Sequence, residues 1–426
     1  MSEKKTNLFN FGKGWLVIIY CMIMFYFICA IATDGTNLTA PNVAKILGVD
    51  AGVVQTRNGY AGLAAIIYFI FMSQLAPRIG AVKVGGMNMI IAAIAFYCME
   101  NPASLTMYTI CYFFAAGAAF SGAYVAGGAL VSKWFPKTKG VVMGYTTMGL
   151  NIASATWVLI MSKAAAAFTL EKAVIVPAII CAAVGVLAMI FIKNTPQEAG
   201  INPDNVSDEV YHRDYDDNEA DDKESRWTTG QLLRTREVWT VAIATGMMQL
   251  CSTGVMSNLV SRNIELGMAP ERAILMMTVI ALVGIFGSWF IGVLDDKFGT
   301  KRVMMCFCVW YGLAIFANVT GTTWGMYLAV VMIGMSIGGS ANFMSSFPTS
   351  VFGRQGYEKM NSVVFPIQQV LTMTAFLIVG IILTATGSIK GGYLVIGCLA
   401  IAAIIPVALT RDHHYNLDWK KEHGEN

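Results

Sequence analysis

Long apolar stretches recur along the whole chain, and they limit its possible folds more than any other feature. Apolar residues occupy 56% of the 426 positions and charged residues only 13%, so the chain has to be solvated by lipid. A helix needs roughly 20 apolar residues to cross about 30 Å of hydrocarbon. We therefore predict an all-α polytopic membrane protein with twelve spans. The predicted spans are 15–38, 53–76, 81–99, 105–132, 140–162, 173–192, 238–260, 272–293, 303–320, 324–348, 361–385 and 391–410.

The distribution of positive charge predicts the orientation of the chain in the membrane. If the N-terminus is cytoplasmic, the inner segments hold 22 of the 29 Lys and Arg residues and the outer segments hold seven. Cytoplasmic loops carry such an excess of basic residues. We therefore expect a multi-pass protein of the plasma membrane, in bacteria the inner membrane, with both termini in the cytoplasm. The outer seven are Lys45, Arg57, Lys163, Lys172, Arg262, Arg272 and Lys390.

A polar stretch from Asn194 to Glu237 separates the predicted spans into two groups of six. We predict two six-helix bundles, residues 1–193 and 238–426, joined by an acidic cytoplasmic linker, residues 194–237. The linker holds twelve acidic residues and few large aliphatic ones, so it buries too little apolar surface to fold alone. We interpret it as a solvated tether; a regulatory or partner-binding segment is the alternative.

The two halves repeat the same landmarks. Gly80 follows the second span and Gly299 follows the eighth, and basic residues surround both glycines. The pair Trp134-Phe135 begins 54 residues after Gly80, and Phe352-Gly353 begins 53 residues after Gly299. Equal spacing of equivalent landmarks indicates duplication, as in transporters that are built from parallel repeats.

The loop after the eighth span resembles the G-x-L-x-D-[KR]-x-G-x-[KR]-[KR] loop of the major facilitator superfamily. The resemblance implies that Gly292 lets two helices approach closely and that Asp296 lies near the positive end of a helix dipole. It also implies that the loop latches one conformational state. In the first half, Ser73 and Pro77 replace the glycine and the acid, so we expect a weaker latch there. The matching residues are Gly292, Leu294, Asp296, Lys297, Gly299, Lys301 and Arg302.

Three further segments resemble the oxalate/formate antiporter and monocarboxylate transporter group of that superfamily. Residues 133–140 read KWFPKTKG, like the entry to helix five in that group. Residues 195–204 are similar to its linker start, and residues 232–239, LLRTREVW, are similar to its entry to helix seven. Together these segments imply a secondary active transporter that works by alternating access, by proton symport or by exchange.

The chain departs from that group at two charged positions. Oxalate/formate antiporters pair a dicarboxylate with an arginine in helix eight and a lysine in helix eleven. Alignment on the Gly292 loop puts Ser288 at the arginine, and alignment on Asn361 puts Gln369 at or next to the lysine. Because both cations are missing, we expect a solute other than oxalate.

Two ionisable residues are candidates for a site inside the membrane, where a charge is costly and usually lines a polar pathway. Asp34 is the one acid within a predicted span, and it would bind a proton or a cationic group of the solute. The alternative is that Asp34-Gly35 is a turn that closes a shorter span at Thr33. Arg57 would attract a carboxylate or pair with Asp34; the alternative is a side chain that extends to the outer interface.

The remaining candidates are hydrogen-bonding side chains in spans that line the cavity in this superfamily. Each one costs free energy in lipid unless it is partnered or wetted, so contact between helices is the competing interpretation for each. Glycines such as Gly334 and Gly338 are expected to let helices approach closely. The polar candidates are Asn37, Tyr124, Tyr145, Asn151, Gln249, Asn258, Asn342, Gln368 and Gln369.

The expected function is transport of a small organic acid that resembles a monocarboxylate. A zwitterionic, cationic or neutral metabolite that uses Asp34 is the alternative, and a transporter-like membrane sensor is a more remote one. The sequence contains no P-loop, nucleotide fingerprint or nucleophile elbow, so we expect no enzyme activity and no cofactor. All four histidines lie in the linker or the C-terminal tail, so we expect no metal site in the membrane. We also expect no nucleic-acid partner and a functional monomer.

Overall fold

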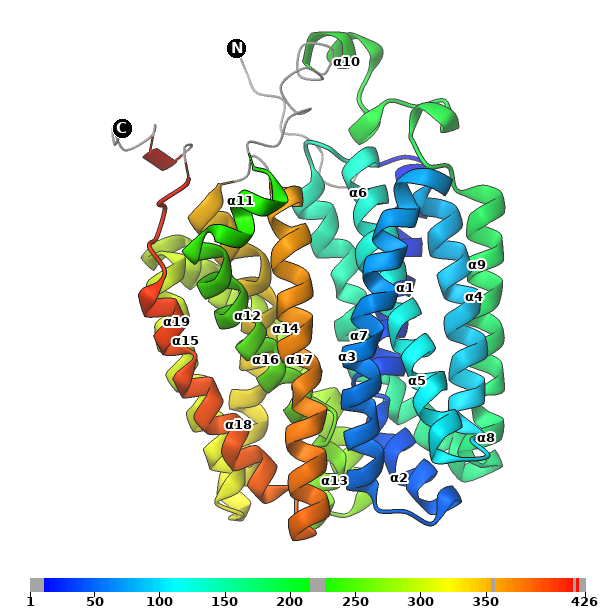
Figure 1. Cartoon of the computed structure of the whole chain (residues 1–426), viewed down its shortest axis with the longest axis vertical. Coiled ribbons are helices and arrows are strands. Elements are labelled where there is room, and N and C mark those ends of the chain that lie inside the picture. Colours follow the sequence, from blue (N-terminus) through cyan, green and yellow to red (C-terminus); the bar gives the residue numbers. More distant parts are fainter. Residues whose placement is uncertain (1–10, 215–226, 354–356, 417–418, 421–426) are drawn as a thin grey trace.

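The computed structural model describes residues 11–214, 227–353, 357–416 and 419–420. These ranges contain helices and no strand, and twelve of the helical segments are long and apolar enough to cross a membrane. The predicted all-α polytopic fold is therefore confirmed. Most of the acidic run of the linker, from Asp216 to Glu224, lies outside the described residues. Within the described residues, α1 begins and α19 ends toward the same end of the molecule, the end of the termini (Figure 1).

The helices form two bundles, with the N-terminal half on the right and the C-terminal half on the left in Figure 1. The N-terminal bundle contains α1 (Gly14–Ala32), α2 (Thr36–Leu47), α3 (Ala51–Ile79), α4 (Ala81–Glu100), α5 (Leu105–Phe120), the π-helix η1 (Ser121–Gly127), α6 (Gly128–Trp134), α7 (Lys139–Phe168), α8 (Leu170–Ala173) and α9 (Ile175–Phe191). The C-terminal bundle contains α12 (Arg236–Met256), α13 (Leu259–Glu265), α14 (Pro270–Phe298), α15 (Thr300–Val319), α16 (Thr323–Phe352), α17 (Tyr357–Thr386), α18 (Lys390–Ala402) and α19 (Ile404–Leu409).

The bundles meet along two pairs of helices, α3 with α17 and α7 with α14. Large apolar side chains remain exposed on the outer surface, among them Ile67, Phe71 and Trp289 at 60% or more. A helix satisfies its own backbone hydrogen bonds, so such a surface is stable against hydrocarbon. The expected close approach at Gly338 is confirmed, because a Cβ there would lie 2.1 Å from the Gly284 carbonyl oxygen of α14.

The first helix of each bundle is broken in the same way. The turn predicted at Asp34-Gly35 is present, and the Gly35 amide donates to the Cys29 carbonyl oxygen (3.2 Å). The chain then resumes as α2, so the first span reaches Leu47 and not residue 38. In the second half the span ends with α12 at Met256, and the short helix α13 follows after a break at Ser257 and Asn258. Both short continuing helices, α2 and α13, lie at the end of the molecule far from the termini (Figure 1).

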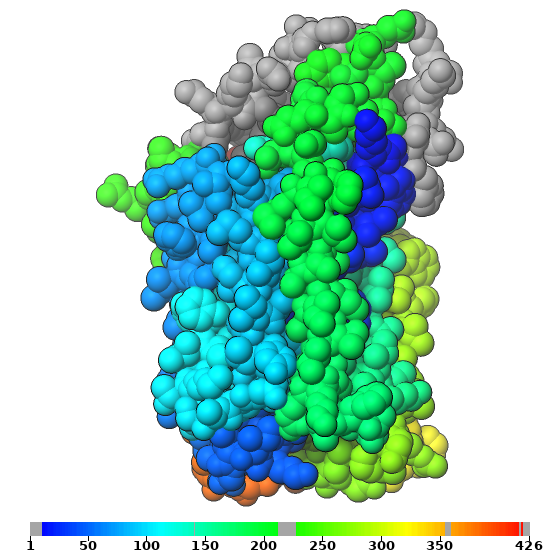
Figure 2. Space-filling view, turned by 90° about the vertical axis from the view of Figure 1, so that its right-hand side faces the viewer, coloured from blue at the N-terminus to red at the C-terminus, as the bar shows by residue number. Residues whose placement is uncertain are grey.

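The first part of the linker is folded onto the N-terminal bundle. The Asp204 carboxylate accepts hydrogen bonds from the amides of Lys137 and Thr138 (3.0 Å each), at the start of α7. The Asn194 side chain accepts from the Val82 amide (3.0 Å) at the start of α4. This part contains η2 (Gln197–Ala199), η3 (Pro203–Asn205) and α10 (Asp208–Asp214). Figure 2 shows the chain continuing from α9 over the top of this bundle.

The last part of the linker and the C-terminal tail are folded onto the C-terminal bundle. The Trp227 ring lies 5.1 Å from the Tyr415 ring, and the Tyr415 ring stacks on Phe352 at 5.5 Å. The Tyr415 amide donates to the Val351 carbonyl oxygen (3.0 Å) at the end of α16. Between Trp227 and α12 lies α11 (Thr229–Arg234). The linker is thus attached to a bundle at each of its described ends.

Candidate substrate pathway between the bundles

Asn37 of α2 joins the two bundles at the end far from both termini, which we call the closed end. The side chain is 4% exposed. Its amide nitrogen donates to the Met256 carbonyl oxygen (2.6 Å), and its oxygen accepts from the Val260 amide (3.0 Å). Those two backbone groups would bond to each other in an unbroken helix. Asn37 therefore replaces the hydrogen bond that the break between α12 and α13 removes.

Other hydrogen bonds between the bundles lie close to this contact. The Gln55 amide of α3 donates to the Asn258 side-chain oxygen (3.1 Å). The Thr36 hydroxyl lies 3.4 Å from the Ser257 carbonyl oxygen. Two of the predicted site residues, Asn37 and Asn258, therefore lie in the contact between the bundles at the closed end.

Glycines bring α3 and α17 into backbone contact near the same end. A Cβ on Gly52 would lie 2.7 Å from the Gly380 carbonyl oxygen. A Cβ on Gly380 would lie 2.5 Å from the Thr56 amide nitrogen. Real Cβ atoms do not approach backbone so closely, so a side chain at either position would push the helices apart.

A small pocket lies between α3, α5 and α17, where the two bundles meet. Its walls are apolar and aromatic except for one amide, Gln369. The side chain of Gln369 is 9% exposed, and its oxygen has no hydrogen-bond partner among the described residues. Ligand pockets typically combine apolar walls with a few polar groups that fix orientation. The lining residues are Gly62, Ala65, Ile66, Phe69, Gly117, Phe120, Pro366, Gln369 and Met373.

The predicted site residue Tyr124 lies on the π-helix η1, which follows the α5 wall of the pocket. Its ring lies 4.3 Å from the ring of Phe365 in α17 and 5.0 Å from that of Phe25 in α1. Phe120, which lines the pocket, stacks on Tyr124 at 6.2 Å. Short π-helical segments occur frequently at functional sites. Tyr124 therefore connects both bundles beside the pocket.

Asp34 is buried in the break between α1 and α2, at 3% exposure. Its carboxyl group lies beside Cys29, Thr33 and Ser154 of α7. One carboxyl oxygen, Oδ2, has no partner among the described residues. Buried polar atoms are usually hydrogen-bonded, so this oxygen is free to bind a proton or a donor group.

Two predicted glutamines hold helices of the C-terminal bundle together. The Gln368 amide donates to the Thr245 hydroxyl (2.6 Å), which joins α17 to α12. The Gln249 amide points at the sulfur of Met344, which joins α12 to α16. Contact between helices was the competing interpretation for both, and these bonds are contacts of that kind.

The other predicted polar residues are dispersed. The Asn342 amide donates to the Ser288 carbonyl oxygen (2.6 Å) and its oxygen accepts from the Ser288 hydroxyl (2.9 Å), within the C-terminal bundle. Tyr145 packs against the ring of Trp15 at 5.8 Å. Asn151 is half-buried on α7, and Arg57 is exposed. No ion pair between Arg57 and Asp34 occurs among the described residues.

The Gly292 loop departs from the expected packing. A Cβ on Gly292 would meet the Asn342 side chain at 3.8 Å, an ordinary contact, so close approach does not require glycine there. The close approach of α14 to α16 lies earlier, where a Cβ on Gly287 would lie 2.5 Å from the Met335 Cα. The expectation for Gly292 was wrong because the glycine that allows close approach is Gly287, more than one turn earlier in α14.

The charged residues of the same loop are mostly exposed. Asp296 is exposed, whereas Asp295 is half-buried beside Ser346 of α16. Lys301 donates to the Thr410 carbonyl oxygen (2.8 Å) and so attaches the loop to the start of the tail. Lys297 and Arg302 are exposed, and Gly299 has a positive φ of 85° that favours glycine. The acid that faces a neighbouring helix is thus Asp295.

Sequence reasoning missed three buried charged residues, and two of them, Glu100 and Arg262, lie at the end far from the termini. Glu100 is 1% exposed at the end of α4, and one of its oxygens accepts a hydrogen bond from the Thr39 hydroxyl. Arg262 is 2% exposed in α13. Both lie one or two residues beyond a predicted span, 81–99 and 238–260. Extending those spans until the next turn signal would have included both residues.

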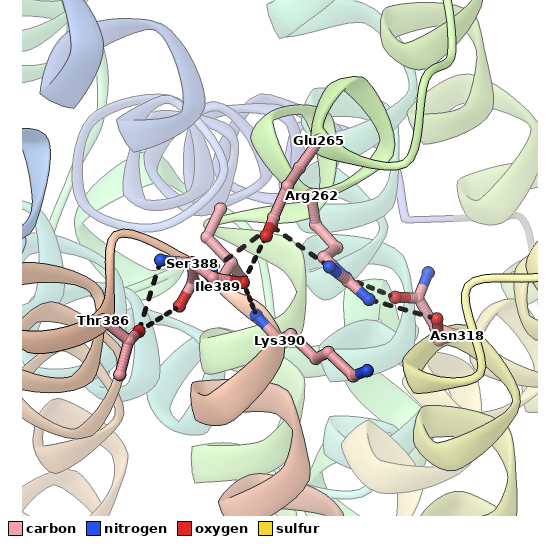
Figure 3. A network of polar contacts seen from close by, with 7 residues as sticks. All are labelled: Arg262, Glu265, Asn318, Thr386, Ser388, Ile389 and Lys390. Carbon is pink, nitrogen blue, oxygen red and sulfur yellow. Dashed lines mark hydrogen bonds and ion pairs between the residues drawn. The ribbon is translucent and has the colours of Figure 1, made fainter.

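Arg262 belongs to a network at the closed end of the C-terminal bundle (Figure 3). It donates to the Asn318 side-chain oxygen (3.0 Å) and carbonyl oxygen (3.3 Å) at the end of α15. It also forms an ion pair with Glu265 (3.1 Å). Glu265 in turn accepts hydrogen bonds from the Ser388 hydroxyl and the Ile389 amide. The network ties α13 to the ends of two other helices of its own bundle.

Comparison with known proteins places this geometry in a family. A model of the Major Facilitator Superfamily matches residues 22–261 and again residues 241–425. The chain is 22% identical over 333 residues to the uncharacterized MFS-type transporter YhjX of Escherichia coli (strain K12), covering 76% of this chain and 78% of that protein. It is 22% identical over 359 residues to the oxalate:formate antiporter of Oxalobacter formigenes, covering 80% and 78%.

Solved structures agree on the fold. The crystal structure of a D-xylose-proton symporter superposes with a TM-score of 0.72 at 10% identity, covering 93% of this chain and 97% of that chain. A POT family transporter in complex with 5-aminolevulinic acid superposes with a TM-score of 0.68 at 13% identity, covering 93% and 96%. At these identities the likeness extends to the fold alone.

Proposed function

Because the chain belongs to the major facilitator superfamily of secondary active transporters, we propose that it carries a small organic acid of monocarboxylate size by alternating access. The observation that carries the proposal is the pocket between α3, α5 and α17, which surrounds one amide, Gln369, with apolar and aromatic walls. The relative that exchanges oxalate for formate, at 22% identity, supports an acid as the solute.

The charge of the pocket favours transport together with a proton. No Lys or Arg is among the described residues that line it. A carboxylate that entered such a pocket alone would carry an unpaired charge into a low-dielectric site, which is costly. An acid accompanied by a proton has no net charge, and Gln369 can donate a hydrogen bond to its carbonyl oxygen. We therefore favour proton symport over exchange.

A zwitterionic, cationic or neutral solute is the second candidate. Its support is Asp34, which is buried and has one carboxyl oxygen without a partner among the described residues. A solute ammonium group that reached this oxygen would compensate its charge.

The orientation proposed from the charge bias, with both termini in the cytoplasm of a cell, puts the closed end outside. The Asn37 contact is then the outer gate. Labelling of engineered cysteines with membrane-impermeant reagents on intact cells tests this orientation.

Uptake by proteoliposomes tests the choice between the solutes. We expect small monocarboxylates to accumulate when the pH outside is lower than inside. Gln369→Leu should raise the KM at least tenfold, whereas Gln74→Leu, at an exposed position of α3, should leave it unchanged. Accumulation of amines or neutral solutes in place of acids would refute the first candidate. If Asp34→Asn leaves uptake and its pH dependence unchanged, the second candidate is refuted.

A further inference from the structure

Glu100 is a buried carboxyl group without a cationic partner. It is the last residue of α4 and is 1% exposed. One oxygen accepts from the Thr39 hydroxyl of α2, and the other, Oε2, has no partner among the described residues. An ionised carboxylate that is buried without a cation costs several kcal/mol, so a single hydroxyl does not compensate it. A structural ion pair therefore does not explain why this carboxyl group is buried.

The C-terminal bundle fills the equivalent place with a paired charge. Thr39 and Arg262 are both the fourth residue of the helix that follows the break, α2 in one bundle and α13 in the other. Thr39 reaches Glu100 at the end of α4, and Arg262 reaches Asn318 at the end of α15. The acid of the C-terminal network, Glu265, is paired with that arginine (Figure 3). At the equivalent place the N-terminal bundle has an acid, Glu100, and a threonine in the position of the arginine.

The charged groups around Glu100 do not supply the missing cation. Glu171 of α8 and Tyr108 of α5 are the titratable groups whose charges act on Glu100. Glu171 would add a second negative charge. The Tyr108 hydroxyl is neutral and donates to the side-chain oxygen of Asn58 in α3 (2.6 Å). Lys45 of α2 and Lys172 of α8 are exposed. Glu100 is therefore surrounded by neutral or negative groups on the helices that pack against it.

The geometry at Thr39 is satisfied by a protonated acid. The Thr39 hydroxyl lies within hydrogen-bond distance of both Glu100 and the Gly35 carbonyl oxygen, the latter at 3.2 Å. A hydroxyl has one hydrogen and can donate to only one of these acceptors. If Glu100 carries a proton, the acid donates to Thr39 and Thr39 donates to Gly35. If Glu100 is ionised, the two acceptors compete for one hydrogen.

We propose that Glu100 is a proton-binding site, and that the bound proton holds α2 in the position that closes the two bundles. Thr39 lies two residues after Asn37, so α2 faces the other bundle through Asn37 and faces α4 through Thr39. Loss of the proton leaves a charge that water has to reach, and α2 then separates from α4. The Asn37 contact opens with it. This inference does not depend on which solute is carried.

Infrared difference spectroscopy on the full-length protein in lipid nanodiscs tests for the proton. The wild type should show a carboxylic acid C=O band that disappears as the pH is raised. Glu100→Gln should lack this band, and Glu171→Gln, at the neighbouring carboxyl group, should retain it. Thr39→Val removes the hydroxyl partner of Glu100. The pH at which half of the carboxylic acid band is lost should then shift by roughly one unit. If the titrating band persists in Glu100→Gln, the proposal is overturned.

Distances between spin labels test the link to closure. Ile46 of α2 and Ile264 of α13 are exposed at the closed end, at 41% and 42%, and labels there report the separation of the bundles. In the wild type the distance should lengthen at alkaline pH; in Glu100→Gln it should stay short at all pH values. An equal lengthening in both proteins would refute control of closure by Glu100. If Glu100→Gln fails to fold, Thr39→Val takes its place. The proposal is then refuted if the carboxylic acid band and the spin-label distance of Thr39→Val change at the same pH as in the wild type.

Discussion

Replacing Asn37 with alanine should open the closed end. The side chain makes two hydrogen bonds to the other bundle, at 2.6 and 3.0 Å, in a site that is 4% exposed. Each such bond contributes about 1 kcal/mol, so Asn37→Ala should destabilise the closed arrangement by about 2 kcal/mol. That free energy corresponds to a roughly 30-fold shift in the equilibrium toward the open arrangement. The loss is larger than that of one hydrogen bond because Asn37 serves two backbone groups, the Met256 carbonyl and the Val260 amide. Without Asn37, water can reach these two groups only when the bundles separate.

Spin labels at Ile46 and Ile264, with the exposed Cys306 and Cys398 replaced, would measure this shift as the fraction of molecules with a long distance. Asn342→Ala is the matched control. Asn342 also makes two side-chain hydrogen bonds, at 2.6 and 2.9 Å, but both join helices of one bundle. The control should lower thermal stability and leave the distances unchanged. Equal distance distributions in Asn37→Ala and the wild type would show that this contact does not hold the bundles together.

Three further substitutions test other parts of the structure. Gly380→Leu places a Cβ 2.5 Å from a backbone nitrogen of α3 and should lengthen the spin-label distance, whereas Gly128→Leu, with open space around it, should not. Arg262→Ala leaves the oxygens of buried Asn318 without their donor and should destabilise the protein by about 2 kcal/mol. The unfolding temperature should fall, whereas it should not fall in Arg272→Ala, at an exposed position. Asp204→Ala removes the linker cap on α7 and should lower that temperature by about 2 °C; no change would mean that the linker is not held there.

The fold could be predicted from the sequence because the membrane imposes a local rule. Each span needs its own apolar stretch, so all twelve spans were recognised from composition alone. The errors lie where protein, and not lipid, surrounds the helix. The first span was ended at residue 38 although α2 continues to Leu47, because α2 carries polar residues such as Asn37 that are buried against the other bundle. Hydropathy does not distinguish such residues from a loop.

The site was less predictable because its contacts join distant parts of the chain. Asn37 was recognised as a polar residue in a pathway helix, but its partners lie 219 and 223 residues later, and no local pattern indicates them. Gln369 was recognised and lies in the pocket. The α3 wall of that pocket was not expected, since its side chains there are apolar. Glu100 was missed because a span prediction stops at the first charged residue.

The glycine contact between α3 and α17 has a consequence for the speed of the transport cycle. Gly52 and Gly380 bring backbone against backbone, and the side chains beside them are the small hydroxyls of Thr384 and Thr56. Because these side chains are small, the two helices can change their crossing angle without rotamer transitions of large side chains, which usually add friction to the movement of packed surfaces. We expect this seam to serve as a pivot that persists in both end states, while the activation barrier arises from breaking the hydrogen bonds of Asn37 to the other bundle.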